Sequence, residues 1–258
     1  MHAASEVARL AAQVALSFAT RGFSVDLKSD GSPVTEADRA AERAAREWIE
    51  QRFPDDGIHG EEFGAVRAEA PRQWLIDPID GTKSFVRGVP LWGTLIAIRA
   101  GDDVLAGAAV LSLGEDLICA APGHGTWWNG SRCRVSGVDT LNQALVLTTD
   151  DTCRARPECR PGWERVQRQA AISRTWGDCY GYFLVATGRA EAMMDPRLSA
   201  WDAACFVPII EEAGGRVTGW DGSPGAFAGS LVATNAGIAA ELRELLRPSD
   251  ADGVDAHA

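Results

Sequence analysis

The alternation of apolar and polar positions predicts two helices at the start of the chain. Alanine and aliphatic residues recur at helical spacing over residues 3–20 and again over residues 34–52. Between them, the run Asp-Gly-Ser-Pro at 30–33 is typical of a turn, and its Ser-Pro pair suits the start of a helix. We therefore expect two opening helices separated by a turn.

Shorter apolar segments follow, and their length and composition predict strands. They lie at residues 73–76, 94–100, 104–111, 116–121 and 144–148. The Gly101-Asp102-Asp103 link indicates a hairpin turn between two of them. The tryptophan pair within residues 125–130 likewise favours a hairpin with a packed tryptophan over a surface on which bases stack. This run of strands predicts an antiparallel sheet packed against the opening helices.

From about residue 150 the pattern changes to helices that alternate with short strands. Helices are predicted at residues 163–171, 180–187, 201–213 and 237–246, and strands at 192–194, 216–218 and 231–234. Functional sites of α/β arrangements gather at strand ends. We expect an α/β layered fold with three parts: an N-terminal half with an antiparallel sheet and helices (1–150), a smaller α/β half (151–247) and a frayed tail (248–258).

Composition and charge narrow the class of protein. The chain has 258 residues, 46% of them hydrophobic, so it can bury a core without disulfides. Its 36 acidic and 25 basic residues give a net charge of −11, which argues against a nucleic-acid or acidic-membrane partner. Neither a leader peptide nor a membrane-spanning stretch is expected, so we predict a soluble, cytoplasmic protein. The surplus carboxylates could serve divalent cations.

The segment 74–82, Trp-Leu-Ile-Asp-Pro-Ile-Asp-Gly-Thr, carries the strongest chemical pattern. An apolar strand runs directly into Asp77, and Pro78 is expected to end the strand so that Asp77 and Asp80 share one tight turn. Two carboxylates held together repel each other unless a cation lies between them. Mg²⁺ prefers oxygen ligands of this kind, which include backbone carbonyls such as that of Ile79. The segment therefore predicts a metal site at a strand end.

The backbone after these acids predicts an anion site. The N–H groups of Gly81 and Thr82 would point outward at a helix start, although Asp-Pro and Asp-Gly are also ordinary turn dipeptides. Further acids occur at strand ends or helix starts: Asp38, Glu61, Glu62 and Asp202. A capping box explains Asp38, and a helix N-terminal charge explains Asp202. Taken together with Asp77 and Asp80, these acids favour a metal and phosphate site.

Five segments together resemble a known family. Residues 30–38, 60–62, 77–82, 201–204 and 212–215 are similar, in order and spacing, to the inositol monophosphatase superfamily of Mg²⁺-dependent, lithium-sensitive phosphatases, with a match over about residues 5–246. The resemblance implies the αβαβα sugar-phosphatase fold, hydrolysis of a small-molecule phosphate monoester and a homodimer. It also implies two or three Mg²⁺ ions, for which Mn²⁺ substitutes.

The resemblance assigns metal ligands. One Mg²⁺ would be held by Glu61, Asp77 and the Ile79 carbonyl, and a second by Asp77, Asp80 and Asp202, with the substrate phosphate bridging the two. Such ions lower the pKa of bound water and neutralise a departing alkoxide.

The same resemblance assigns the reacting groups. Thr82 would position the attacking water, Asp38 would accept a hydrogen bond from Thr82, and Glu61 would take part through its metal. The phosphate would rest on the N–H groups of Gly81 and Thr82. Glu62 would either orient the ligands or bind a weak third ion.

The substrate must be read from the second half of the chain. The segment 174–182, Arg-Thr-Trp-Gly-Asp-Cys-Tyr-Gly-Tyr, is similar to the histidinol-phosphate phosphatase branch, as are residues 80–85 and 90–95. Asp178 would pair with the ammonium or imidazole of histidinol, unless it serves only as a helix N-terminal residue. Asp195 is a second candidate for substrate contact. Inositol-1-monophosphatase or broad sugar-phosphatase activity is the alternative to a role in histidine biosynthesis.

Overall fold

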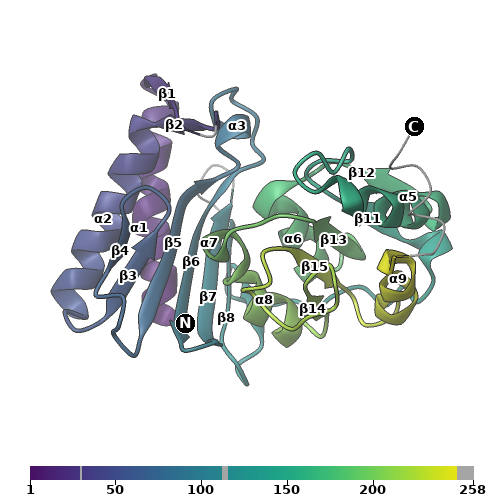
Figure 1. Ribbon diagram of the computed structural model, residues 1–258. Helices are drawn as coiled ribbons and strands as arrows, with labels where there is room; N and C mark the ends of the chain where they lie inside the picture. The colour runs from purple at the N-terminus through teal and green to yellow at the C-terminus, as the bar shows by residue number, and fades with distance from the viewer. Residues whose placement is uncertain (30, 112–115, 249–258) are drawn as a thin grey trace.

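The computed structural model describes residues 1–29, 31–111 and 116–248, so Asp30 of the predicted turn and the predicted tail beyond residue 248 lie outside it. Five layers follow one another across the molecule (Figure 1): a pair of helices, a large sheet, a layer of helices, a smaller sheet and a second pair of helices. The predicted layered α/β fold is confirmed.

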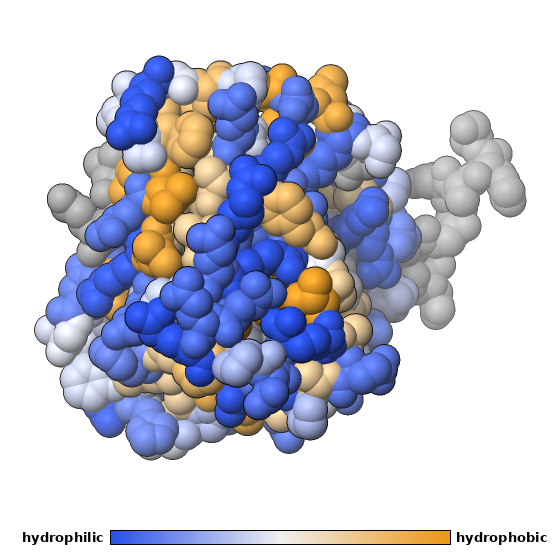
Figure 2. All heavy atoms as spheres, turned by 90° about the vertical axis from the view of Figure 1, so that its left-hand side faces the viewer, coloured by the Kyte–Doolittle hydropathy of each residue, from blue (hydrophilic) through white to orange (hydrophobic). Residues whose placement is uncertain are grey.

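The first layer consists of α1 (His2–Ala19) and α2 (Glu36–Arg52), joined through the short pair β1 (Val25–Leu27) and β2 (Pro33–Thr35). Small side chains let the two helices approach each other and the sheet. The fully buried alanines of this contact are Ala4, Ala8, Ala11, Ala15, Ala37, Ala41 and Ala45. Figure 2 shows that the outer face of this side is mainly hydrophilic, as an amphipathic helix pair requires.

The large sheet has eight strands in the order β10-β9-β8-β7-β6-β5-β3-β4. Their bounds are β3 (Gly57–Gly60), β4 (Gly64–Val66), β5 (Gln73–Asp80), β6 (Gly93–Ala100), β7 (Asp103–Leu111), β8 (Asp116–Ala120), β9 (Thr126–Trp128) and β10 (Ser131–Arg132). All pairs are antiparallel except β3 and β5, which run parallel. The predicted hairpin between β6 and β7 is confirmed, and Gly101 supplies its positive φ of 59°.

Both faces of the central strands are buried, because helices cover each side. Ile76 and Ile96 pack toward α1 and α2, whereas Leu75 and Leu95 pack toward the helices between the two sheets. This double burial explains why β5 and β6 have nearly continuous apolar sequences rather than an alternating pattern.

The smaller sheet has the order β12-β11-β13-β15-β14. Its strands are β11 (Leu145–Leu147), β12 (Ile172–Arg174), β13 (Ala192–Asp195), β14 (Arg216–Thr218) and β15 (Leu231–Thr234). The remaining helices are α3 (Thr82–Phe85), η1 (Leu141–Gln143), η2 (Pro157–Cys159), α5 (Arg160–Gln169), α6 (Asp178–Ala186), α7 (Ala200–Ala203), α8 (Phe206–Glu212) and α9 (Ala239–Leu246). Helices α6 and α8 lie between the sheets, and α5 and α9 cover the outer face (Figure 1).

Two predictions about these elements were wrong in detail. The strand predicted at 144–148 exists as β11, but it pairs in parallel with β12 and β13 of the smaller sheet, because apolar periodicity does not specify a strand's partner. The helix predicted at 201–213 is divided into α7 and α8. Pro208, in the first turn of α8, has no N–H to donate to the carbonyl of Ala204. The helical hydrogen bonds are therefore interrupted between Ala203 and Phe206. The division at residue 150 stays a prediction.

Among the helices of the described ranges, none combines the length and the apolar character needed to cross a bilayer.

Candidate active site

Three carboxylates converge where β5 ends and α7 begins. Each of Asp77, Asp80 and Asp202 offers an oxygen within 4.8 Å of the others. Pro78 does not end the strand as predicted. Instead β5 continues to Asp80, with a shift in its register against β6 between the two acids. The backbone irregularity thus replaces the predicted tight turn, and the two β5 acids lie together with Asp202 from the second half of the chain.

The environment of this cluster disfavours uncompensated negative charge. Burial, followed by the charges of Glu61, Asp80 and Asp202, raises the pKa of Asp77 well above its ordinary value. Burial, then Asp178 and Asp202, likewise raises the pKa of Asp80, and burial raises the pKa of Asp202 to about 6. A buried set of carboxylate oxygens is the ligand chemistry that a hard divalent cation takes. The cluster could therefore hold a metal ion.

Backbone donors fix two of these carboxylates. The N–H of Ser199 donates to Asp202 Oδ2 at 2.8 Å as part of a capping box on α7. The N–H of Cys179, at the start of α6, donates to Asp80 Oδ2 at 2.5 Å. Asp202 therefore has the helix N-terminal place that the sequence suggested, here as part of a capping box, and it can also belong to the cluster because its second carboxylate oxygen stays available.

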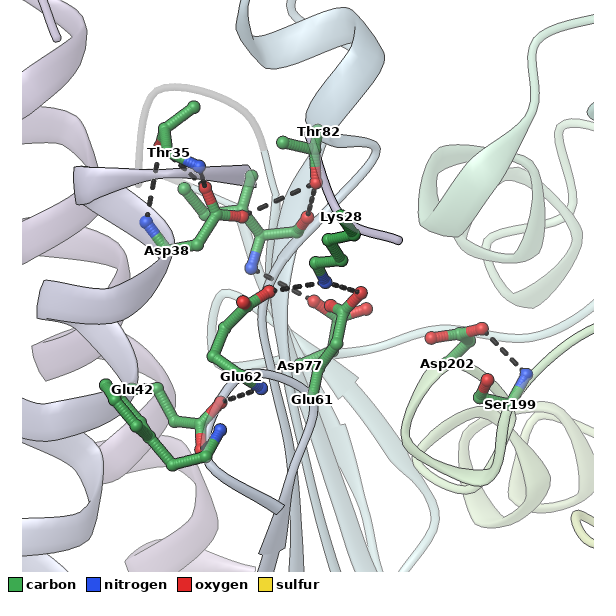
Figure 3. A network of polar contacts seen from close by, with 12 residues as sticks. Lys28, Thr35, Asp38, Glu42, Glu61, Glu62, Asp77, Thr82, Ser199 and Asp202 are labelled. Carbon is green, nitrogen blue, oxygen red and sulfur yellow. Dashed lines mark hydrogen bonds and ion pairs between the residues drawn. The ribbon is translucent and has the colours of Figure 1, made fainter. Parts of the chain in front are cut away.

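Glu61 and Glu62 follow β3 and share a cation (Figure 3). Lys28 Nζ lies 2.7 Å from an oxygen of each carboxylate. Burial by itself lowers the pKa of Lys28, but its hydrogen bonds and the charges of the two glutamates outweigh burial and raise the pKa. No role was predicted for Lys28. Its contact with Glu61 joins residues 33 positions apart in the chain, so the local sequence carries no signal of it.

Asp38 combines a structural and a chemical contact on its two oxygens. Asp38 Oδ2 accepts hydrogen bonds from the N–H and hydroxyl of Thr35, which form the capping box of α2. The Thr82 hydroxyl has two acceptors for its one proton, Asp38 Oδ1 at 3.4 Å and the Ile79 carbonyl at 3.0 Å. Burial raises the pKa of Asp38. Asp38 thus caps α2 through one oxygen and faces Thr82 through the other, as Figure 3 shows.

Gly81 makes the turn from β5 into α3 possible. Its φ of +84° lies in the left-handed region, and a Cβ there would meet the Leu91 carbonyl oxygen at 2.6 Å. Helix α3 begins at Thr82, so the N–H groups of this turn have no acceptor within the helix. The anion site at Gly81 and Thr82 stays a prediction, with backbone geometry that suits it.

A cavity of about 440 Å³ lies next to the cluster. Its lining residues are Lys83, Ser84, Leu91, Thr149, Asp150, Arg154, Thr175, Gly177 and Asp178. Asp178 begins α6 with a positive φ of 50°, and its N–H donates to the Thr149 hydroxyl oxygen at 2.9 Å. Burial, with a smaller contribution from Asp195, raises the pKa of Asp178 to about 7. The cavity thus presents both cationic and acidic side chains.

Asp195, the other predicted substrate contact, lies in the interior at the end of β13. Its Oδ2 accepts from the Tyr182 hydroxyl at 2.9 Å and its Oδ1 from the Thr149 N–H at 3.0 Å. Asp195 is 3% exposed and is absent from the cavity lining. Its contact with substrate stays a prediction, and its observed bonds give it a role in holding Thr149. The sequence did not assign Tyr182 or Thr149 any part in the site.

Glu42 is a further polar residue near the site for which no role was predicted. It lies on α2 one turn after Asp38 and is completely buried among the alanines of that helix. Glu42 lies at the edge of the apolar stripe that contains Ala37, Ala41 and Ala45, a position typical of a solvated acid, so the sequence gives little signal of its burial. Buried acids are rare unless they have partners, so the burial seen in the structure indicates a polar contact.

The five-layer fold with a carboxylate cluster at a strand end defines the class: a layered α/β protein with a candidate metal centre. The family model for the inositol monophosphatase family matches residues 1–250, and the chain belongs to that family.

Individual relatives agree with this membership. The histidinol-phosphatase of Chlorobaculum parvum is 41% identical over 82% of both chains. The histidinol-phosphatase of Streptomyces coelicolor is 37% identical over 87% of this chain and 88% of the relative. The structure of an inositol monophosphatase from Zymomonas mobilis superposes with a TM-score of 0.85 at 31% identity, covering 95% of this chain and 96% of that one.

Proposed function

We propose that this protein is a magnesium-dependent histidinol-phosphatase, which converts L-histidinol phosphate and water to L-histidinol and phosphate in histidine biosynthesis. The observation that carries the proposal is the mixed-charge cavity beside the Asp77, Asp80 and Asp202 cluster. The cavity lies beside the cluster, because Asp178 lines the cavity and the N–H of the next residue, Cys179, donates to Asp80. The two relatives named histidinol-phosphatase support the same substrate.

The charges of the cavity suit both ends of this substrate. A phosphate monoester carries between one and two negative charges at neutral pH, while histidinol carries an ammonium and an imidazole. Lys83 and Arg154 supply positive charge for the phosphate end. The carboxylate of Asp178 suits the ammonium, with which it can form a charge-assisted hydrogen bond. A neutral polyol such as inositol would offer the Asp178 carboxylate no cationic group to pair with.

Mg²⁺ fits the donor atoms of the cluster. The carboxylates of Asp77, Asp80 and Asp202 would hold two ions together with the Ile79 carbonyl and with Glu61, whose charge acts on Asp77, and Glu62 would contribute to a weak third. Mn²⁺ would substitute, because it accepts the same oxygen ligands. When bound, Mg²⁺ lowers the pKa of water and stabilises the negative charge that develops on the leaving oxygen.

The protein's own groups orient the reaction. When the Thr82 hydroxyl donates to Asp38 Oδ1, its lone pairs are free to accept a hydrogen bond from the attacking water. Asp38 is suited to accept the proton because burial raises its pKa. The N–H groups of Gly81 and Thr82 would bind the phosphate oxygens, where negative charge increases in the transition state.

The substrate assignment is tested by comparing kcat/KM for histidinol phosphate and inositol 1-phosphate. We expect histidinol phosphate to be preferred, and Asp178→Asn to lower its kcat/KM by about 10- to 100-fold, the cost of losing a charged hydrogen bond. Asp55→Asn, at an exposed acid, is the matched control. If inositol 1-phosphate is preferred, the protein is an inositol-1-monophosphatase or a broad sugar phosphatase. If Asp178→Asn changes nothing, Asp178 does not select the substrate.

The proposal includes a cytoplasmic homodimer, which is supported by family resemblance. Light scattering coupled to size-exclusion chromatography tests the dimer directly, and a mass of a single chain at micromolar concentration would refute it.

A further inference from the structure

Glu42 is a buried carboxylate that the proposed reaction does not use. Its side chain is fully buried on α2 and lies to the lower left of Glu62 in Figure 3. Glu42 Oε2 accepts from the Glu62 N–H at 2.7 Å. Glu42 Oε1 accepts from the Phe63 N–H at 3.2 Å and from Arg46 Nε at 2.7 Å. Every one of these partners is an N–H donor.

The two backbone amides belong to the turn that carries Glu61. On its other side this turn is fixed to the sheet, because the Glu61 N–H donates to the Ile76 carbonyl at 3.1 Å. The close approach of Glu42 depends on Gly60, where a Cβ would lie 2.0 Å from Glu42 Oε1. The turn is therefore held between β5 and the Glu42 carboxylate.

An ion pair with Arg46 does not account for this arrangement. A carboxylate that only neutralised an arginine would not also bind two successive backbone amides. Arg46 extends the same contact, since it also donates to the Gly64 carbonyl at the start of β4. Glu42 and Arg46 thus enclose residues 61–63 from α2.

We propose that Glu42 is a positioning residue for metal binding, which holds this turn so that Glu61 presents its carboxylate toward Asp77. The inference rests on the proposed function, since it takes Glu61 as a metal ligand. A carboxylate is required because it accepts on both oxygens. A glutamine of the same size has one acceptor, so its NH₂ group would face the N–H of either Glu62 or Phe63.

Metal binding to the full chain tests the proposal. We would titrate wild type, Glu42→Gln and Glu47→Gln with Mn²⁺ and follow free Mn²⁺ by electron paramagnetic resonance. Glu47 is exposed on the same helix, so its variant matches the charge change. Glu42→Gln is expected to raise the dissociation constant by about 10- to 100-fold, the usual effect of losing support behind a ligand. The Mg²⁺ concentration for half-maximal phosphate release should rise equally, while kcat at saturating Mg²⁺ stays within about twofold.

A double-mutant cycle separates this inference from the ligand assignment. If Glu42 acts through Glu61, Glu42→Gln should add less than about twofold in a Glu61→Gln background. The inference is overturned if Glu61→Gln weakens Mn²⁺ binding but Glu42→Gln behaves like Glu47→Gln. It is also overturned if the increase in the dissociation constant of the double variant equals the product of the increases in the two single variants. If Glu61→Gln binds Mn²⁺ as tightly as wild type, the proposed ligand set is wrong, and the role of Glu42 fails with it.

Two measurements protect the test against a variant that does not fold. Gly60→Ala displaces the Glu42 carboxylate without changing any charge, and it should weaken Mn²⁺ binding in the same direction. Hydrogen exchange on the wild type requires no variant. The amides of Glu62 and Phe63 should be protected, and exchange at the rate of an unstructured turn would overturn the proposal.

Discussion

Asp202→Asn is expected to make the metal-free protein more stable while it removes activity. The substitution deletes one negative charge from the cluster with Asp77 and Asp80. It keeps the helix cap, because the asparagine side-chain oxygen can still accept the hydrogen bond from the Ser199 N–H. The change in the free energy of unfolding therefore reports mainly the charge.

The magnitude follows from the pKa of Asp202, which burial raises from 3.8 to about 6. At ~1.36 kcal/mol per pKa unit, this difference corresponds to at most about 3 kcal/mol. The pKa of Asp202 is higher in the folded state than in the unfolded state. The contribution of Asp202 to stability is therefore fully present below pH 3.8 and is lost as pH rises through about 6. The free energy of unfolding of Asp202→Asn should thus exceed that of wild type by up to about 3 kcal/mol at pH 7 and equal it near pH 4.

Thermal unfolding in EDTA measures this difference. For a chain of this size, about 3 kcal/mol raises Tm by roughly 6–12 °C at pH 7. The matched control Asp55→Asn should shift Tm little, because Asp55 is exposed. Added Mg²⁺ should stabilise wild type much more than Asp202→Asn, which loses a ligand. A variant that is no more stable than wild type at pH 7 in EDTA would refute the reasoning.

Four further substitutions test other contacts. Asp38→Asn and Asp80→Asn should each abolish Mg²⁺-dependent phosphate release with an unchanged circular dichroism spectrum, and full activity in either purified variant would disprove its proposed role. Gly81→Ala places a side chain at φ +84° and 2.6 Å from a carbonyl oxygen, so a loss of about 1–3 kcal/mol is expected in urea unfolding; an unchanged midpoint would contradict the close approach. Tyr182→Phe removes a donor from buried Asp195 and should cost about 1–3 kcal/mol, whereas wild-type stability would show that the bond is not needed.

The sequence by itself determined the local elements and most of the chemistry. Helical and strand periodicity predicted the opening helices and the central strands, and the Gly101 link predicted their hairpin. These features depend on residues near one another in the chain, so a window of sequence contains their cause. The segment 77–82 likewise placed two of the three clustered acids within one short stretch.

Only the tertiary structure decided which distant residues meet. It assigned β11 to the smaller sheet, joined Lys28 to Glu61, and placed Glu42 behind the turn after β3. It also buried Asp195 beneath the cavity instead of at its surface. Strand partners and buried polar contacts arise from long-range packing, in which each donor must find an acceptor once water is excluded. A short window of sequence does not contain both partners of such a contact, so these contacts cannot be predicted from local patterns.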